Sequence, residues 1–393
     1  MLFLTRYFGV TANDSERILG AEQACHEEIV EKVLRLQANA AAKEHSPLSR
    51  GTHKKGVSVR AQFEVLDVTV GRAGLLADRL AQGMFATPGV YPAIARFANS
   101  DPNSHSDFKA DVRAMSFSVD LTRNGTAGPP AKVDRQDFSL QNATTLPIND
   151  APAFLATMKV LTASNPGRGL WSLPFKDKLR VVRTLTLAQL QSHQTVKPYQ
   201  QLRYWSTVPF RHGPIDIVKQ SVTPSPDNPS HPLQRSNPNG LQDELIRHVN
   251  EDSRMSSFDF GVQFLDPDRM TYWEKRRDAN FWIENASVEW NEVEAPFHAV
   301  ARLTLLPKSV LQPEAADATY IDVTGHSSPD STPLGSMNRA RWAGEVASRK
   351  ARLHATDSRE HDPESEEPYG GAAQGGEGTQ ESARRTGNLR AAG

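Results

Sequence analysis

The chain has 393 residues, of which 38% are hydrophobic, so it is long enough to bury a core in one large domain or two smaller ones. Its 45 lysines and arginines balance 46 aspartates and glutamates, and this excludes the strong positive field that gathers nucleic acid or anionic membranes. No stretch approaches the roughly 20 apolar residues of a membrane span, and the apolar run in MLFLTRYFGV is too short for a secretory signal. Cys25 is the only cysteine, so no intrachain disulfide can form and a cytoplasmic location is expected.

The N-terminal region is predicted to be helical between residues 13 and 43. Apolar residues recur there every three or four positions, from Ile18 to Ala40, and form one stripe. Asn13, with Glu16 three residues later, is a variant of the capping box that begins many helices. The stripe is interpreted as a surface that packs against the rest of the fold.

Strict alternation of apolar and polar residues predicts the first strand at 57–65. The alternation slips at Leu66, which indicates a bulge or bend near 65–66. The same period recurs at 258–264 and is most regular at 297–305. Because no regular succession of strand and helix accompanies these segments, an antiparallel barrel or sandwich is favoured. Shorter extended segments are expected near 90–98, 112–121, 215–222 and 281–290.

Helices are predicted between the strands, and two polar connections at 223–238 and 312–335. From about residue 355 the sequence has almost no apolar content, which is typical of disorder. The expected organisation is an N-terminal helical arm at 1–46, a barrel with helices at 47–354 and a disordered tail at 355–393. The predicted helices lie near 73–83, 151–164, 174–193, 239–250 and 336–354.

Five short motifs occur in a fixed order along the chain. They are Arg50-Gly-Thr-His53-Lys-Lys-Gly56, Tyr91-Pro-Ala-Ile-Ala-Arg96-Phe97, Asp111-Val-Arg113-Ala-Met115, Asp137-Phe-Ser-Leu-Gln-Asn142 followed by Asp150 and Phe154, and Trp290-Asn-Glu-Val-Glu-Ala-Pro296-Phe297. Together these motifs resemble segments of the catalase-like haem superfamily. That resemblance implies an α+β fold, with an antiparallel barrel of about eight strands surrounded by helices.

The resemblance implies haem b as cofactor and gives the motif residues their roles. Cleavage of a peroxide O–O bond needs a base that moves a proton between the two oxygens, and the resemblance assigns this role to His53. Asn142 is the expected amide donor to the peroxide, and Gln141 takes its place if the register shifts by one residue.

Three further residues are expected to hold the cofactor. Arg50 and Arg96 match the arginines that pair with the haem propionates, because buried carboxylates need cationic partners. Phe154 is expected to stack on the porphyrin. The alternatives are ordinary surface ion pairs for the arginines and a plain core position for Phe154.

Two positions depart from typical catalases. Ala98 stands where a serine usually supports the distal histidine, and Thr52 stands before His53 in place of a bulkier aliphatic residue. The Thr-His pair resembles the small catalase-related peroxidases and allene oxide synthases. The expected substrates are therefore small-molecule peroxides or lipid hydroperoxides, with weak disproportionation of hydrogen peroxide.

The proximal iron ligand is the largest departure. Catalase-like proteins use a tyrosinate one helical turn after an arginine, and here Arg341 matches the arginine while Glu345 takes the tyrosine position. No tyrosine occurs in residues 321–368. Three alternatives remain for the proximal side: Glu345 ligates the iron, another residue ligates it, or haem is bound weakly or not at all. The competing interpretation is a surface ion pair between Arg341 and Glu345, worth ~0.3–0.5 kcal/mol.

Two functional hypotheses follow. The first is a haem-dependent peroxidase or hydroperoxide-converting enzyme that acts in the cytoplasm, with no nucleic-acid partner and no membrane span; a homodimer is compatible with the resemblance. The second is a haem-free or weakly haem-binding relative that keeps the barrel without the chemistry, because a fold does not carry a function by itself.

Overall fold

The computed structural model describes residues 22–45, 48, 55–70, 74–101, 105–122 and 134–360. Of the described residues, those up to Leu353 belong to one compact unit, and those from His354 to Glu360 belong to a second. The described residues leave out Ile18 and Asn13 of the predicted N-terminal helix. They also leave out everything beyond Glu360, which includes most of the predicted tail.

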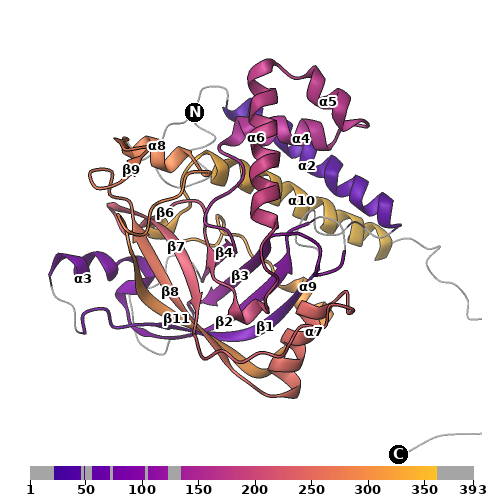
Figure 1. The fold of residues 1–393 in the computed structure, drawn as a ribbon. Coiled ribbons are helices and arrows are strands. Elements are labelled where there is room, and N and C mark those ends of the chain that lie inside the picture. The colour runs from indigo at the N-terminus through magenta and orange to yellow at the C-terminus, as the bar shows by residue number, and fades with distance from the viewer. Residues whose placement is uncertain are drawn as a thin grey trace, which may run out of the picture. The chain divides into compact units, whose positions relative to one another are not determined.

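Eight antiparallel strands close into a barrel (Figure 1). The ring order is β5, β4, β3, β2, β1, β11, β8, β7, and pairing of β5 with β7 closes it. The predicted α+β fold with an antiparallel barrel of about eight strands is therefore confirmed. The strands are β1 Gly56–Val65, β2 Gly89–Asn99, β3 Arg113–Asp120, β4 Arg135–Gln141, β5 Tyr204–Trp205, β6 Phe210–His212, β7 Asp216–Pro224, β8 Ser256–Phe264 and β11 Phe297–Val310, with a separate hairpin of β9 Thr271–Tyr272 and β10 Lys275–Arg276.

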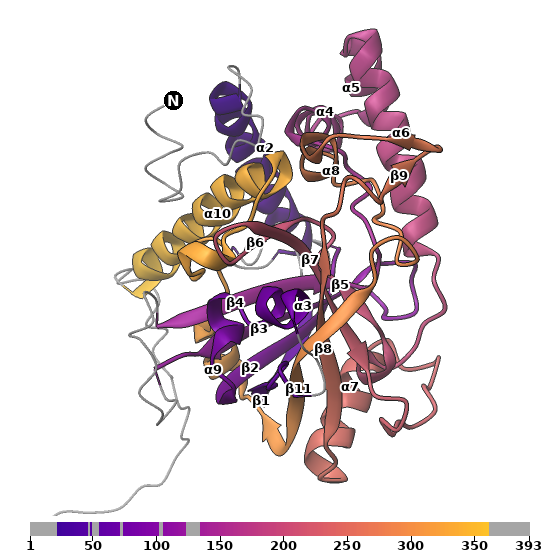
Figure 2. The ribbon, with the colours of Figure 1, turned by 90° about the vertical axis from the view of Figure 1, so that its left-hand side faces the viewer.

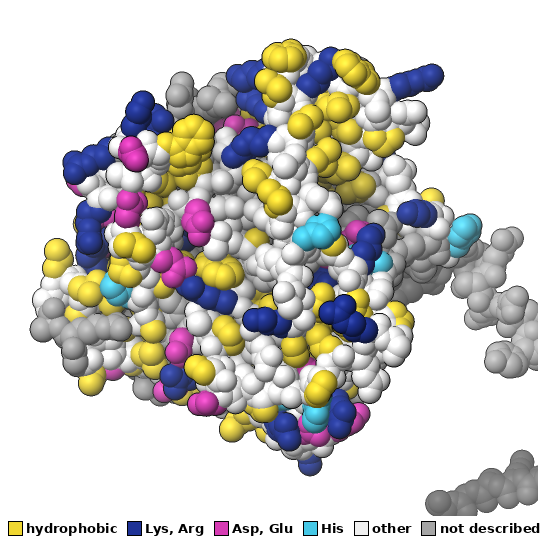
Figure 3. Space-filling model, in the orientation of Figure 1, with side chains coloured by type: hydrophobic (Ala, Val, Ile, Leu, Met, Phe, Trp, Pro, Cys, Tyr) yellow, Lys and Arg dark blue, Asp and Glu magenta, His cyan; other side chains and the backbone are white. Residues whose placement is uncertain are grey.

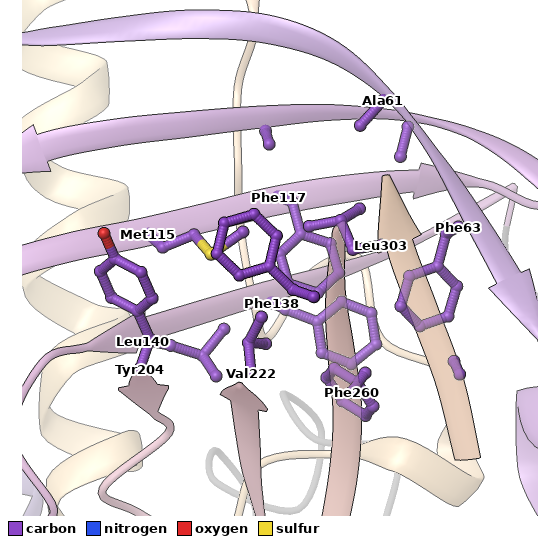
Figure 4. Close-up of a cluster of buried hydrophobic side chains, with 14 of the residues drawn as sticks. Ala61, Phe63, Met115, Phe117, Phe138, Leu140, Tyr204, Val222, Phe260 and Leu303 are labelled. Carbon is purple, nitrogen blue, oxygen red and sulfur yellow. The ribbon is translucent and has the colours of Figure 1, made fainter. Parts of the chain in front are cut away.

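Aromatic side chains fill the interior of the barrel. The period of two along each strand turns every second residue inward. The ring centroid of Phe63 lies 5.7, 5.9 and 5.5 Å from those of Phe117, Phe138 and Phe260 (Figure 4). None of these four side chains is more than 1% exposed. The interior is thus a packed core, and a large ligand has to bind on the outer surface of the barrel.

Helices cover one end and one side of the barrel (Figures 1 and 2). The helix α4 packs between α2 and α6. No helix of the described ranges is both long enough and apolar enough to cross a bilayer. The helices are α2 Glu22–Glu44, α3 Leu75–Leu80, α4 Ala151–Leu161, α5 Pro166–Ser172, α6 Phe175–Ser192, α7 Gly240–Ile246, α8 Ala279–Glu284, α9 Pro313–Ala318 and α10 Ser336–Glu360, with short helical turns at Gly83–Ala86, Tyr199–Gln201, Arg247–Glu251 and Pro329–Ser331.

Two sequence expectations are wrong. The segment 281–290 was predicted to be extended, but it begins inside α8 because the side chain of Asp278 accepts a hydrogen bond from the amide of Phe281 and caps the helix. The predicted bulge near 65–66 is absent from the pairing of β1, which ends at Val65. The irregularity lies instead between Val59 and Ala61, opposite β11.

A buried lysine anchors the segment that follows α8. Lys219 of β7 donates a hydrogen bond to the carbonyl of Val288 (3.0 Å), and its Nζ lies 4.9 Å from the ring centroid of Trp290. Glu284, the last residue of α8, accepts a hydrogen bond from the amide of Ser336 (2.8 Å), where α10 begins. By holding the residues next to α8, Lys219 helps to set the position of α10. Burial lowers the pKa of Lys219 to about 7.

Lys219→Met should remove a pH dependence of stability. Between about pH 7 and the ordinary pKa of 10.5, the unfolded chain carries a proton that the folded protein lacks, so wild-type stability rises with pH across that window. The full difference is of the order of 4–5 kcal/mol. Urea denaturation at pH 7 and pH 9.5 should show a smaller rise in the variant than in the wild type. Equal rises in both would contradict the depressed pKa.

Candidate functional site

The outer face of β1–β4 carries a shelf of small side chains. The strand register aligns outward-facing residues in rows that cross the four strands. We call the first two rows the outer shelf; glycine, alanine or serine occupies six of their eight positions. These small side chains leave little bulk above the strands, and Ser58, Ala98 and Ala114 are each no more than 4% exposed in the structure. The first row is Gly56, Ala98, Ala114 and Gln141, the second Ser58, Arg96, Ser116 and Ser139, and the third Arg60, Ile94, Ser118 and Asp137.

Arg96 is the one cation on the outer shelf, and it lies over Gly56. A Cβ atom at Gly56 would stand 3.0 Å from Nη2 of Arg96 and 2.4 Å from the carbonyl oxygen of Phe97. Glycine is therefore required at this position for steric reasons. Arg96 is partly exposed, as a side chain that pairs with a ligand carboxylate must be.

Ser58 stands beside Arg96 in the same row. It is 2% exposed, and its hydroxyl has no hydrogen-bond partner in the structure. An unsatisfied buried hydroxyl costs about 1–3 kcal/mol. A ligand atom on the outer shelf that accepts or donates a hydrogen bond would relieve this cost.

Asn142 follows directly after β4 and is 6% exposed. Its Oδ1 accepts a hydrogen bond from the amide of Arg113 (2.7 Å), and its Nδ2 donates to Oε1 of Gln194 (3.1 Å). These two bonds fix the amide and leave one N–H of Nδ2 for a ligand. The alternative donor, Gln141, lies on the outer shelf and donates from Nε2 to the carbonyl of Thr145 (3.1 Å).

His53 and Arg50 lie outside the described residues, as does Thr52. The next described residue is Lys55, whose Nζ contacts Oδ1 of Asp107 and the carbonyl of Pro238, each at 2.8 Å. These contacts fix the residue that precedes Gly56, which is the first residue of β1 and stands at one end of the first shelf row. In the sequence His53 precedes that row by three residues.

Phe154 of α4 packs against two hydrophobic clusters, one containing Met337 and the other Ala340. Both of these residues belong to α10. The phenylalanine is partly buried, so the structure brings it to the N-terminal half of α10. Its stacking on a porphyrin stays a prediction.

Arg341 and Glu345 form the ion pair expected at this spacing on α10. Nε of Arg341 donates to Oε1 of Glu345 over 2.6 Å, and the two side chains are 32% and 41% exposed. This contact is the surface pair of the competing interpretation. A metal ion at Glu345 would have to share the carboxylate with Arg341.

Sequence reasoning missed a polar group between β4 and α10. Asp137, in the third row, is 0% exposed, and its Oδ2 accepts from the amide of Asp322 and from Nδ1 of His326, each at 2.7 Å. Tyr320 donates to Oδ2 of Asp322 (2.8 Å), and the guanidinium of Arg349 lies 3.4 Å from the tyrosine ring centroid. These contacts of the loop therefore tie the outer face of β4 to α10.

Tyr320 lies near α10 and directly precedes the tyrosine-free residues 321–368. Burial and the neighbouring Asp322 raise its pKa, while Arg349 opposes them. The hydroxyl is therefore held as a neutral hydrogen-bond donor. The sequence contains one signal for this polar group, namely Asp137 as the first residue of a motif. His326 lies in the polar 312–335 connection, where no sequence pattern distinguishes it.

Some of the described residues have the chemistry that haem requires of its surroundings. The small side chains of the outer shelf, the unsatisfied hydroxyl of Ser58 and the guanidinium of Arg96 fit a flat group with carboxylates. Among the described residues, no cluster of three histidine, cysteine or acidic side chains is arranged to hold a bare metal ion. These groups are chemically compatible with a flat ligand that carries carboxylates, and both haem binding at the outer shelf and the iron ligand stay predictions.

Comparison with known proteins gives the fold. No protein-family model matches the sequence, and no curated protein matches it. A fungal catalase is 12% identical with a TM-score of 0.56, and catalase A from Saccharomyces cerevisiae is 14% identical with a TM-score of 0.55; each covers 81% of the chain. A bacterial catalase is 12% identical, with a TM-score of 0.51, over 94% of the chain and 70% of its own length.

The chain spans 62% and 63% of the lengths of the first two catalases. At identities this low, the likeness concerns the arrangement of the backbone and not the side chains of a site. The chain has the fold of the catalases.

Proposed function

We propose that the protein is a haem-dependent oxidoreductase that converts hydroperoxides. The observation that carries this proposal is the outer shelf of small side chains on β1–β4, with Arg96 and the unsatisfied Ser58 hydroxyl on it. Support also comes from the five motifs and from the fold shared with three catalases.

Each candidate residue has a defined task in this proposal. Bound haem would supply the redox-active iron at which a peroxide is cleaved. His53 moves the proton from the near oxygen of the peroxide to the far one. The remaining N–H of Asn142 donates a hydrogen bond to the peroxide. Arg50 and Arg96 pair with the propionates, and Phe154 packs against the edge or face of the macrocycle.

The preferred substrates are organic hydroperoxides, with lipid hydroperoxides among them. Ala98 is 1% exposed in the first shelf row, where it offers no hydroxyl to support His53. Thr52 adds a polar group beside the histidine, which favours a held water or substrate over fast disproportionation. The sequence pair Thr52-His53 agrees best with the branch of small catalase-related peroxidases and allene oxide synthases.

A second candidate function is a haem-free or weakly haem-binding relative. One observation favours it: Glu345, at the position of the proximal ligand, is already bonded to Arg341 at 2.6 Å on a partly exposed face. A carboxylate engaged in this way binds iron at the cost of its ion pair. The two candidates differ in haem affinity, so they are separable by titration.

His53→Ala should abolish turnover of an organic hydroperoxide by the hemin-loaded protein, because no other base is expected at the peroxide. The absorption spectrum of the loaded protein should stay largely unchanged. His193→Ala, which alters an exposed histidine at the end of α6, is the matched control and should keep full turnover. Wild-type turnover in His53→Ala would sink the proton-transfer role, and vigorous oxygen release from hydrogen peroxide would contradict the substrate preference.

Glu345→Tyr should raise hemin affinity by roughly 10- to 100-fold, the scale on which substitutions in metal sites act. The phenolate reaches further than the carboxylate, and Arg341 one turn earlier keeps it ionised. Charge-transfer bands of the tyrosinate type should appear in the visible spectrum. The exposed Glu251→Tyr is the control and should change neither measurement.

Glu345→Ala completes this experiment. If the first candidate function holds, Glu345→Ala should bind hemin more weakly than the wild type does. Unchanged binding in both Glu345→Tyr and Glu345→Ala would show that α10 does not supply the ligand. The surface ion pair would then be the whole role of Glu345.

A further inference from the structure

The helices α5 and α6 carry a row of exposed apolar side chains. Trp171 and Phe175 are 78% and 75% exposed, and Leu179, Val182 and Leu190 are 56%, 51% and 68% exposed. Figure 3 shows hydrophobic and basic side chains gathered over these helices. Single exposed apolar residues are common, but a contiguous row marks a surface that binds a partner.

The row is distinct from the face that holds α6 on the protein. Phe175, Leu179, Val182 and Leu190 follow helical spacing and share the outward side of the helix. The inward side is marked by Val181, which is 0% exposed and packs in a cluster with residues of α4. The helix is anchored by this inward side, so the outward row is not needed for folding.

Cations flank the apolar row on both sides. At 100° per residue, Lys176 and Arg183 lie on one flank and Lys178 on the other. The ammonium of Lys178 stands 5.1 Å from the ring centroid of Trp171. We call these three cations, together with the five apolar residues of the row, the α5–α6 surface.

The local charge of this region differs from that of the whole chain. Residues 166–192 hold five lysines and arginines and one carboxylate, that of Asp177. Asp177 is bound to Arg180 at 2.7 Å, so it does not neutralise the flanking lysines. The balance of 45 basic and 46 acidic residues over the full sequence conceals this concentration.

Shape and charge together identify the partner. The corner of α5 and α6 stands out from the barrel in two perpendicular views, so it is convex (Figures 1 and 2). Two copies that met through this surface would place like charges together. A bilayer with anionic lipids accepts apolar and tryptophan side chains at its interface and provides phosphates for the flanking lysines.

We propose that the α5–α6 surface docks the protein onto an anionic lipid bilayer as an interfacial helix. The apolar row enters the boundary between head groups and acyl chains, and the cations contact the lipid phosphates. Docking of this kind requires no membrane span and no haem. If the proposed function also holds, it brings the protein to the place where lipid hydroperoxides form.

Co-sedimentation with vesicles tests the proposal on the full chain. The vesicles are pure phosphatidylcholine, or phosphatidylcholine with roughly 30% phosphatidylglycerol. Binding should rise about tenfold or more with the anionic lipid and should fall as salt is added, because screening weakens surface electrostatics. Tryptophan emission should shift to shorter wavelength on binding, and Trp171→Phe should reduce that shift.

Two double variants separate the apolar and the charged contributions. Trp171→Ser with Phe175→Ser, and separately Lys176→Gln with Lys178→Gln, should each lower binding by about tenfold or more. The matched controls alter exposed residues of the same kinds elsewhere and should bind like the wild type. They are Leu75→Ser with Ile215→Ser, at 75% and 83% exposure, and Lys308→Gln with Lys350→Gln.

Three results would overturn the proposal. They are the absence of binding to anionic vesicles, equal binding to neutral and anionic vesicles, and binding that neither double variant reduces. Sedimentation equilibrium adds a fourth: a dimer that Trp171→Ser with Phe175→Ser abolishes would assign the surface to a second copy of the chain. Circular dichroism confirms that each variant is folded. Because none of these measurements uses haem, they stand apart from the tests of the proposed function.

Discussion

The closed barrel around its aromatic core is the constraint on which the rest of the structure depends. Phe63, Phe117, Phe138 and Phe260 meet at the centre of the eight strands and leave the interior to side chains. Closure of the barrel also leaves the outward-facing residues of β1–β4 in aligned rows. A large ligand therefore has to bind on the outer surface of the barrel. The register between the strands decides which side chains lie together on that surface.

A loop between β11 and α10 packs against the outer surface of the barrel and connects it to α10. Asp137 holds the loop at Asp322 and His326, and Tyr320 of the same loop lies under Arg349 of α10. At the other end of the helix, Glu284 bonds to the amide of Ser336 and to the guanidinium of Arg339. Each of these contacts is between side chains or backbone atoms far apart in the sequence, so α10 is positioned by tertiary contacts.

Patterns of period two and of three to four residues predicted much of the fold. The strands at 57–65, 258–264 and 297–305 and the helices at 151–164 and 174–193 are confirmed, with small differences at their ends. The strand β4 was missed because it is only seven residues long and the polar Gln136 stands in phase with its two apolar positions, Phe138 and Leu140. The segment at 281–290 failed because a single cap at Asp278 outweighs a weak alternation.

The candidate site was less accessible to sequence reasoning. Motifs identified Arg96, Asn142 and Phe154, and the structure places Arg96 on the outer shelf, Asn142 just after β4 and Phe154 beside α10. The outer shelf itself could not be read from the sequence, since it consists of glycine, alanine and serine positions from four strands. Only the register between the strands makes them one surface.

The central claim is that the outer shelf binds haem, and the hemin affinity of Ser116→Trp tests it most directly. Ser116 lies in the second shelf row, and a tryptophan there would fill the shelf without entering the barrel core. The control is Glu64→Trp, on an exposed outward position of β1 beyond the shelf. The account predicts that Ser116→Trp loses hemin binding while Glu64→Trp keeps the wild-type affinity. Equal hemin affinity in the wild type and Ser116→Trp, or no binding in the wild type, would contradict it.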